Sequence, residues 1–174
     1  MEQNQPKTGK YALNFGVILG VISVVFAFML YSLDMHYQGG FAVMGVSIVL
    51  TIIFIILGMI QFKKANNGFM SFGQALKIGV GISLVGAVIS VLFNQVLINF
   101  IDPDTMTKAF EYQREQLIAA GQLSVEQVDA QMEMGKSFST PGMQIAFGLL
   151  GSLFFGFILS LVPALILKKS NPEN

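Results

Sequence analysis

Four stretches of the chain carry no charged residue, and each is long enough to cross a lipid bilayer. They are the runs 11–33, 41–62, 78–101 and 143–167. A membrane-spanning helix needs about 20 mostly apolar residues to cover a hydrocarbon core of roughly 30 Å. All 10 Lys and Arg and all 10 Asp and Glu lie outside these four runs. The sequence therefore predicts an all-α integral membrane protein, a bundle of four transmembrane helices.

The segments between these runs complete the predicted organisation. The first run is a retained helix and not a secretory signal, because its apolar length exceeds a signal core and no small-x-small cleavage pattern follows it. In chain order we expect a cytoplasmic tail (1–10), a first span (11–33), a second span (41–62), a third span with an interfacial start (72–101), a helical hairpin (102–140), a fourth span (141–167) and a cytoplasmic tail (168–174).

Capping patterns set the predicted helix boundaries. Ser71 to Gln74 and Ser124 to Gln127 each fit the pattern Ser-x-x-Gln, and Thr140-Pro141 starts the last span. Asp102-Pro103 predicts a capping carboxylate ahead of a proline at the first helical position, so the third span either stops at Ile101 or kinks into the next helix. The two hairpin helices have narrow apolar faces, which either meet each other or lie on the membrane surface.

Basic residues are divided unevenly between the two sides of the predicted bundle. One side receives Lys7, Lys10, Lys63, Lys64, Lys77, Lys168 and Lys169, whereas the hairpin holds Lys108, Arg114 and Lys136. Loops rich in Lys and Arg stay in the cytoplasm. We therefore expect both termini to be cytoplasmic and residues 102–142 to face outward.

Composition excludes several kinds of site. The chain has no Cys, which removes disulfides and thiolate metal ligands, and its formal net charge of zero gives no field for nucleic acid. His36 is the only histidine and lies in a short loop, where an interfacial polar residue is a better interpretation than a metal ligand. No span contains an ionisable group that could do acid–base work. We expect no catalytic, cofactor-binding or metal-binding residues and no enzymatic activity.

Small residues recur at four-residue spacing in three of the spans. This spacing lets helix backbones approach closely, which favours association in lipid. It indicates packing within the chain, or else homo-oligomerisation or docking on a larger complex. The predicted packing residues are Gly16, Gly20, Gly79, Ser83, Gly148, Ser152, Gly156 and Ser160.

Asn94 and Gln95 are the most polar pair inside a span. We interpret them as interhelical hydrogen-bonding groups, and the alternative is a site lined by water or for a small solute. Their candidate partners are the hydroxyls of Ser23, Ser47, Thr51 and Ser152.

Two motifs together resemble a known family. One is the run from Gly68 to Gly79 (GFMSFGQALKIG), which opens a helix, and the other is Phe100-Ile101-Asp102-Pro103-Asp104, which closes it. With the long polar insert before the last span and the terminal Lys168-Lys169, the chain resembles the domain-of-unknown-function 4199 (DUF4199) family, small four-helix membrane proteins found mainly in Bacteroidetes. The resemblance implies the inner membrane of a Gram-negative cell, with the hairpin in the periplasm. It implies no activity and no catalytic residues.

The sequence thus favours a non-enzymatic scaffold or accessory subunit that packs with other membrane helices or a periplasmic partner. Its partners would be membrane lipids and either a second copy or a larger membrane complex. The alternative is a minimal transporter or channel for a neutral or lipid-like solute, with Asn94 and Gln95 lining the path. A membrane enzyme ranks third, because its chemistry would rest on loop carboxylates alone.

Overall fold

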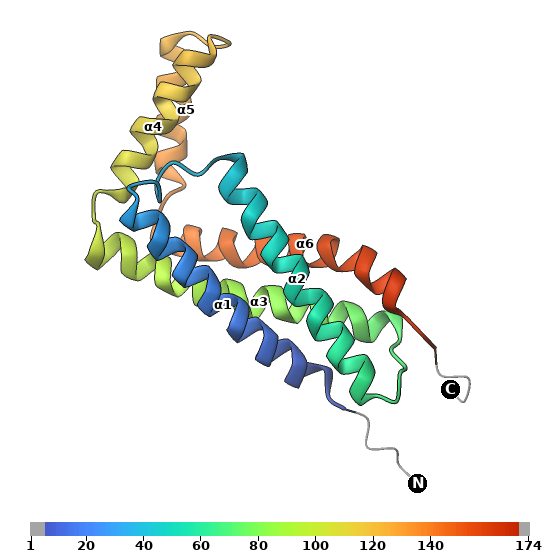
Figure 1. Cartoon of the computed structure of the whole chain (residues 1–174). Coiled ribbons are helices and arrows are strands. Elements are labelled where there is room, and N and C mark those ends of the chain that lie inside the picture. Colours follow the sequence, from blue (N-terminus) through green and yellow to red (C-terminus); the bar gives the residue numbers. More distant parts are fainter. Residues whose placement is uncertain (1–5, 171–174) are drawn as a thin grey trace.

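The computed structural model describes residues 6–170, which are all-helical apart from turns and one isolated bridge. Four long apolar helices form a bundle, and two shorter helices project from one end of it (Figure 1). The long helices are α1 (Thr8–Ser32), α2 (Gly40–Ala65), α3 (Phe72–Val96) and α6 (Pro141–Leu167), and the short ones are α4 (Thr105–Ala120) and α5 (Val125–Ser137). This confirms the predicted all-α class.

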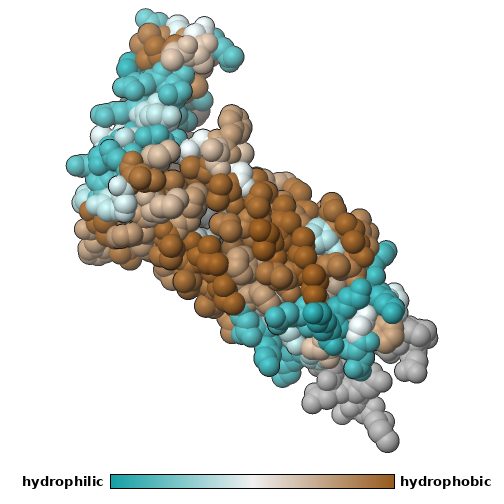
Figure 2. All heavy atoms as spheres, in the orientation of Figure 1, coloured by the Kyte–Doolittle hydropathy of each residue, from teal (hydrophilic) through white to brown (hydrophobic). Residues whose placement is uncertain are grey.

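The four long helices are each apolar and long enough to cross a bilayer. Their exposed side chains form a broad hydrophobic belt with hydrophilic residues at both ends (Figure 2). We call the end where α1 begins and α6 finishes the terminal end, and the opposite end, where α4 and α5 are attached, the hairpin end. This belt is the surface expected of a membrane protein.

Three of the predicted helix starts are confirmed by their caps. Ser71 and Ser124 each form a complete capping box with the glutamine three residues later. Thr140 accepts a hydrogen bond from the Met143 N–H, and Pro141 occupies the first turn of α6. Gly121 adopts a left-handed conformation, with φ of 66°, at the end of α4.

The junction after α3 confirms one of the two predicted alternatives and corrects a detail. The third span stops at Ile101 and a new helix follows, but its last turn is a short π-helix, η1 (Leu97–Ile101), in which the Asp102 N–H donates to the Leu97 carbonyl at 2.8 Å. The prediction that Asp102 caps a helix beginning at Pro103 was wrong, because α4 begins at Thr105. The Asp102 carboxylate is used elsewhere, as described below.

The tightly packed core lies in the terminal half of the bundle. Here α3 packs between α1 and α6, and α2 contacts all three. Ile55, Met59 and Phe62 of α2 and Ile78 and Ile82 of α3 are fully buried in this half.

Contacts at the terminal end hold the chain together beyond the helix packing. Met70 and Lys169 form an antiparallel bridge, and Lys63 Nζ donates to the Leu167 carbonyl at 2.7 Å. The Lys169 ammonium also lies 5.4 Å from the centre of the Phe69 ring. The loop between α2 and α3 is therefore joined to the end of α6.

Candidate intramembrane cavity

The hairpin half of the bundle encloses a cavity of about 510 Å³. All four long helices contribute to its wall, and the side chains that line it are small, apolar or hydroxyl-bearing. The wall runs along α1 from Leu19 to Leu30, a length of roughly 16 Å at 1.5 Å per residue. This is about half the thickness of the hydrocarbon core, so the cavity is as deep as one leaflet.

The cavity exists because the facing helix surfaces in this half carry small residues. Gly86 and Ala87 of α3 and Gly148 and Ser152 of α6 are among the residues that line the cavity. The large apolar side chains of the same turns, such as Leu92 and Phe154, are exposed on the outside of the bundle. Side chains that would fill the space thus point toward lipid.

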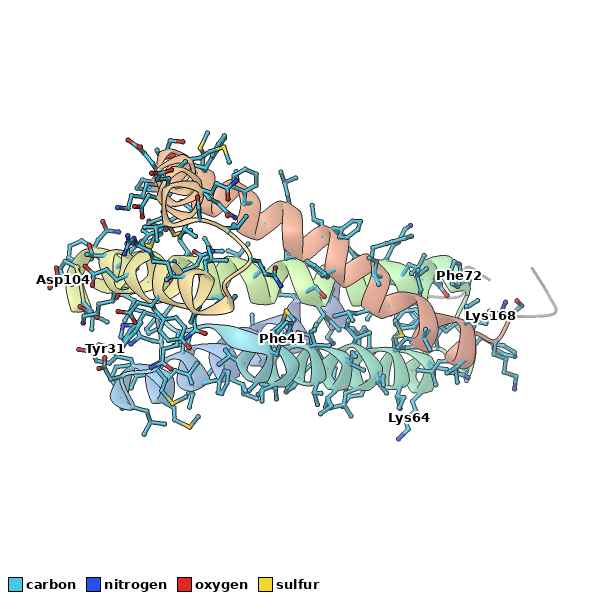
Figure 3. The ribbon with its side chains drawn as sticks, turned by 90° about the horizontal axis from the view of Figure 1, so that it is seen from above. Tyr31, Phe41, Lys64, Phe72, Asp104 and Lys168 are labelled. Carbon is cyan, nitrogen blue, oxygen red and sulfur yellow. The ribbon has the colours of Figure 1, made fainter. Side chains whose placement is uncertain are left out.

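The opening lies between α2 and α6. Among the lining residues, Met44 and Ser47 of α2 and Phe155 of α6 are exposed, with Met44 at 52% and Phe155 at 58%. Figure 3 shows α2 and α6 close together near Lys64 and Lys168 and diverging toward the hairpin end. A molecule in the bilayer can therefore reach the cavity sideways, between two helices.

Six hydroxyl groups line the cavity, and the protons of all but Ser90 are bonded within their own helices. Ser23 donates to the Leu19 carbonyl at 2.9 Å, and Ser83 donates to the Gly79 carbonyl at 3.2 Å. Ser47, Thr51 and Ser152 likewise donate to carbonyls of their own helices. These five hydroxyls need no partner from an occupant, so an apolar molecule can lie against them without leaving their donors unsatisfied.

The residues predicted to pack helices lie where two helices come close. A Cβ atom at Gly16 would meet Val85 Cβ at 2.6 Å, and one at Gly156 would meet Ser83 Cβ at 2.6 Å. Gly20 faces Ile89, Gly79 faces Ser160, and Gly148 faces Val91 in the same way. Ser83, Gly148, Ser152 and Gly156 also line the cavity. That these approaches drive association stays a prediction.

Gln95 has a hydrogen-bond partner that the sequence did not suggest. Its Nε2 donates to Gln144 Oε1 of α6 at 3.3 Å, and Gln144 Nε2 in turn donates to the Ser139 carbonyl at 2.9 Å. None of the four candidate hydroxyls is the partner of Gln95, because each donates to a carbonyl of its own helix. Gln144, itself inside an uncharged run, was overlooked as a partner.

These amides sit at the hairpin end of the cavity. Val91 and Gly148 both line it. Gln95 lies one turn after Val91 in α3, and Gln144 lies one turn before Gly148 in α6. Asn94 follows Ser90 by one turn on the same face of α3, and it is exposed. We call Asn94, Gln95 and Gln144 the amide layer.

A second polar cluster, which we call the His36 clamp, lies outside the four spans. It comprises His36, Asp102, Thr105 and Lys108. The His36 side chain is only 3% exposed, and its Nε2 lies 2.9 Å from Asp102 Oδ2 and 3.2 Å from Thr105 Oγ1. Lys108 Nζ donates to the same carboxylate oxygen at 2.9 Å. The loop between α1 and α2 is thereby tied to the base of the hairpin.

The Asp102 carboxylate of the His36 clamp is ionised. The Lys108 ammonium, joined by His36 and Thr105 and opposed by burial, lowers the pKa of Asp102 from 3.8 to about 2. Because an ionised carboxylate only accepts hydrogen bonds, His36 Nε2 carries the hydrogen in this contact. His36 Nδ1 is buried and has no hydrogen-bond partner in the part of the chain that the structure describes.

The geometry of the His36 clamp does not support nucleophilic catalysis. In a catalytic triad the histidine contacts the acid through one ring nitrogen and the nucleophile through the other. Here the same nitrogen faces both Asp102 and Thr105, and the Thr105 hydroxyl donates to the Asp102 carbonyl at 2.8 Å. Tyr31 and Tyr37 pack edge-on against the His36 ring, with centroids 5.1 and 5.3 Å away. The cluster is built to hold a loop in place.

Comparison with known proteins places the chain in a family. A family model described as a protein of unknown function, DUF4199, matches residues 14–169. The chain belongs to the DUF4199 family. The predicted resemblance is therefore confirmed over most of the chain. No curated protein and no solved structure matches it.

Within residues 6–170 of this DUF4199 chain, no group of three His, Cys, Asp or Glu side chains could hold a metal ion. The arrangement that the fold does provide is a cavity with apolar walls and a layer of neutral amides at one end. Such a site suits binding an apolar chain.

Sequence reasoning missed the role of His36 and its pairing with Asp102. A usable signal was present, since the only histidine and an acid both fall in segments that the topology brings to the same end of the bundle.

Proposed function

We propose that this protein is a non-enzymatic membrane protein that binds the apolar chain of a lipid-like molecule in its intramembrane cavity. We place it in the bacterial inner membrane with both termini in the cytoplasm. The observation that carries the proposal is the cavity of about 510 Å³ itself, which lies within the usual size of ligand sites, roughly 300–1,000 Å³. It is one leaflet deep and opens toward the bilayer between α2 and α6.

The chemistry of the wall supports an apolar chain over water or an ion. An ion pathway needs charged groups or free carbonyls along its length. The lining contains no charged side chain, and five of its six hydroxyls are bonded to their own helices. An acyl chain entering from the membrane would replace one apolar environment by another.

Native mass spectrometry of the purified protein tests this proposal. We expect wild-type protein released from detergent micelles to retain one lipid-like molecule. Ser152→Phe, which fills the cavity, should lose it. Leu153→Phe adds the same ring one residue along α6 at an exposed position and should retain it. Equal retention by the two variants, or no retained molecule in wild type, would contradict the proposal.

A second candidate function is favoured by the hairpin of α4 and α5. It projects from the bundle (Figure 1) and exposes Met134 at 61% and Phe138 at 52%. Large exposed apolar residues on a projecting element are typical of a partner surface. In this role the protein is an accessory subunit, and Met134→Glu should release a partner that co-purifies with wild type in fixed ratio. Co-purification unchanged by Met134→Glu would contradict it.

A further inference from the structure

We infer that the occupant of the cavity is an amphiphile with an uncharged polar head, bound by the amide layer of Asn94, Gln95 and Gln144. This inference rests on the proposed function and adds the chemical class of the ligand. It follows from the position of the amides, from their chemistry, and from the way the cations at the hairpin end are used.

The amide layer is placed to meet the head of a molecule whose chain fills the cavity. Gln95 and Gln144 are one helical turn beyond the lining residues Val91 and Gly148. Asn94 lies one turn beyond Ser90, on the face of α3 that lines the cavity, and its amide is exposed. A head group there would find donors and acceptors together, since each side-chain amide offers both.

The amide layer offers no charge of its own to pair with a charged head group. Asn94 and Gln95 belong to the uncharged run 78–101, and Gln144 belongs to the uncharged run 143–167. A charge held inside such a run is costly unless an opposite charge meets it. A hydroxyl, glycerol or amide head can instead exchange its hydrogen bonds with water for bonds to the amides.

The basic residues of the hairpin are already engaged with other groups. Lys108 bonds to Asp102, and Arg114 bonds to Asp129 at 2.6 Å. The Lys136 ammonium lies 5.7 Å from the centre of the Phe110 ring. These three are the only Lys and Arg between residues 78 and 167. A phosphate at the mouth of the cavity would have to break one of these contacts to gain a counter-charge.

The test uses two photoreactive probes with the same diazirine-bearing acyl chain. One is a monoacylglycerol, which is neutral, and the other is the corresponding lysophosphatidic acid, which is anionic. Purified full-length protein is irradiated with increasing amounts of each probe, and the labelled peptides are identified by mass spectrometry. We expect saturable labelling of cavity-lining peptides by the neutral probe, at a half-saturating concentration about tenfold lower than for the anionic probe.

Variants of the amide layer connect this preference to named residues. Asn94 is exposed, so Asn94→Leu should fold normally and raise the half-saturating concentration of the neutral probe several-fold. Asn94→Ser keeps a hydrogen-bonding group and should stay close to wild type. The anionic probe should respond to neither substitution. Equal affinity of wild type for the two probes, or no effect of Asn94→Leu, would overturn the inference.

The two proposals fail in different ways. If neither probe gives saturable labelling that Ser152→Phe abolishes, the cavity does not bind such molecules and the proposed function fails. If Ser152→Phe blocks both probes but their affinities are equal, the cavity binds an apolar chain and only the assignment of a neutral head fails.

Discussion

The same four helices pack differently in the two halves of the bundle. In the terminal half, Ile55, Met59 and Phe62 of α2 are fully buried against their neighbours. In the hairpin half of the same helix, Met44, Val46 and Val49 are exposed, and the space between the helices is a cavity. The terminal half provides the stability, and this leaves the hairpin half free to stay open for a ligand.

The difference arises from where large and small side chains face. In the terminal half the glycines accept a bulky neighbour, as Gly58 accepts the tip of Ile82. In the hairpin half the small residues of α3 and α6 line a space that their neighbours leave partly unfilled. The same residue types therefore produce close packing in one place and a cavity in the other, depending on what lies opposite.

The largest predicted effect concerns the side of the membrane that each end of the bundle faces. Alkaline phosphatase fused after Gly121, at the hairpin end, should be active in bacterial cells because the positive-inside rule places this end in the periplasm. Fusion after Asn67, at the terminal end, should be inactive. Alkaline phosphatase activity per unit of fusion protein distinguishes the two fusions. The reverse pattern would place the cavity in the cytoplasmic leaflet.

The next effect compares two methionines of α2 directly. Met59→Ala removes a fully buried side chain from the terminal half and should lower the free energy of unfolding by about 2–5 kcal/mol. Met44→Ala removes an exposed side chain from the hairpin half and should cost about 0.5 kcal/mol or less. Denaturation by SDS measures both. Similar losses for the two variants would mean that the halves are equally packed.

A smaller effect is expected at two glycines of α6. Gly156→Leu should destabilise the protein by about 1–3 kcal/mol, because its side chain must enter the space held by Ser83. Gly151 has no neighbour within 4 Å of a Cβ atom at that position, so Gly151→Leu is the matched control and should fold normally. Thermal stability in detergent distinguishes them. If Gly156→Leu were as stable as the control, α3 and α6 would not be in contact there.

The smallest effect concerns how the hairpin is anchored. The pKa of Asp102 in the folded protein, about 2, is below its ordinary value of 3.8, so its stabilising contribution is complete above pH 4 and is lost as the pH falls toward 2. Hydrogen exchange of α4 amides should therefore increase over this range. Asp102→Asn should show faster exchange already at neutral pH and a flatter pH profile. An unchanged profile in this variant would show that the His36 clamp does not hold the hairpin.

Sequence alone could predict the features that depend on neighbouring residues. The spans follow from runs without charge, and the caps at Ser71, Ser124 and Thr140 follow from contacts within one turn. The contact of His36 with Asp102 joins residues 66 positions apart, and that of Gln95 with Gln144 joins residues 49 apart. Such pairs depend on how the helices are oriented. The cavity is harder still to predict from the sequence, since it depends on how far α2 and α6 diverge toward the hairpin end.

The π-helix between α3 and the hairpin makes this junction sensitive to chain length. Its hydrogen bond from the Asp102 N–H to the Leu97 carbonyl accommodates one residue more than an α-helical turn. Deleting a single residue within 97–101 would restore an ordinary turn and rotate everything after it by about 100° around the axis of α3. The Asp102 carboxylate would then point away from His36, and the hairpin would leave the bundle in another direction. Relatives of this protein that place the hairpin in the same way are therefore expected to keep the length of this segment even where its residues change.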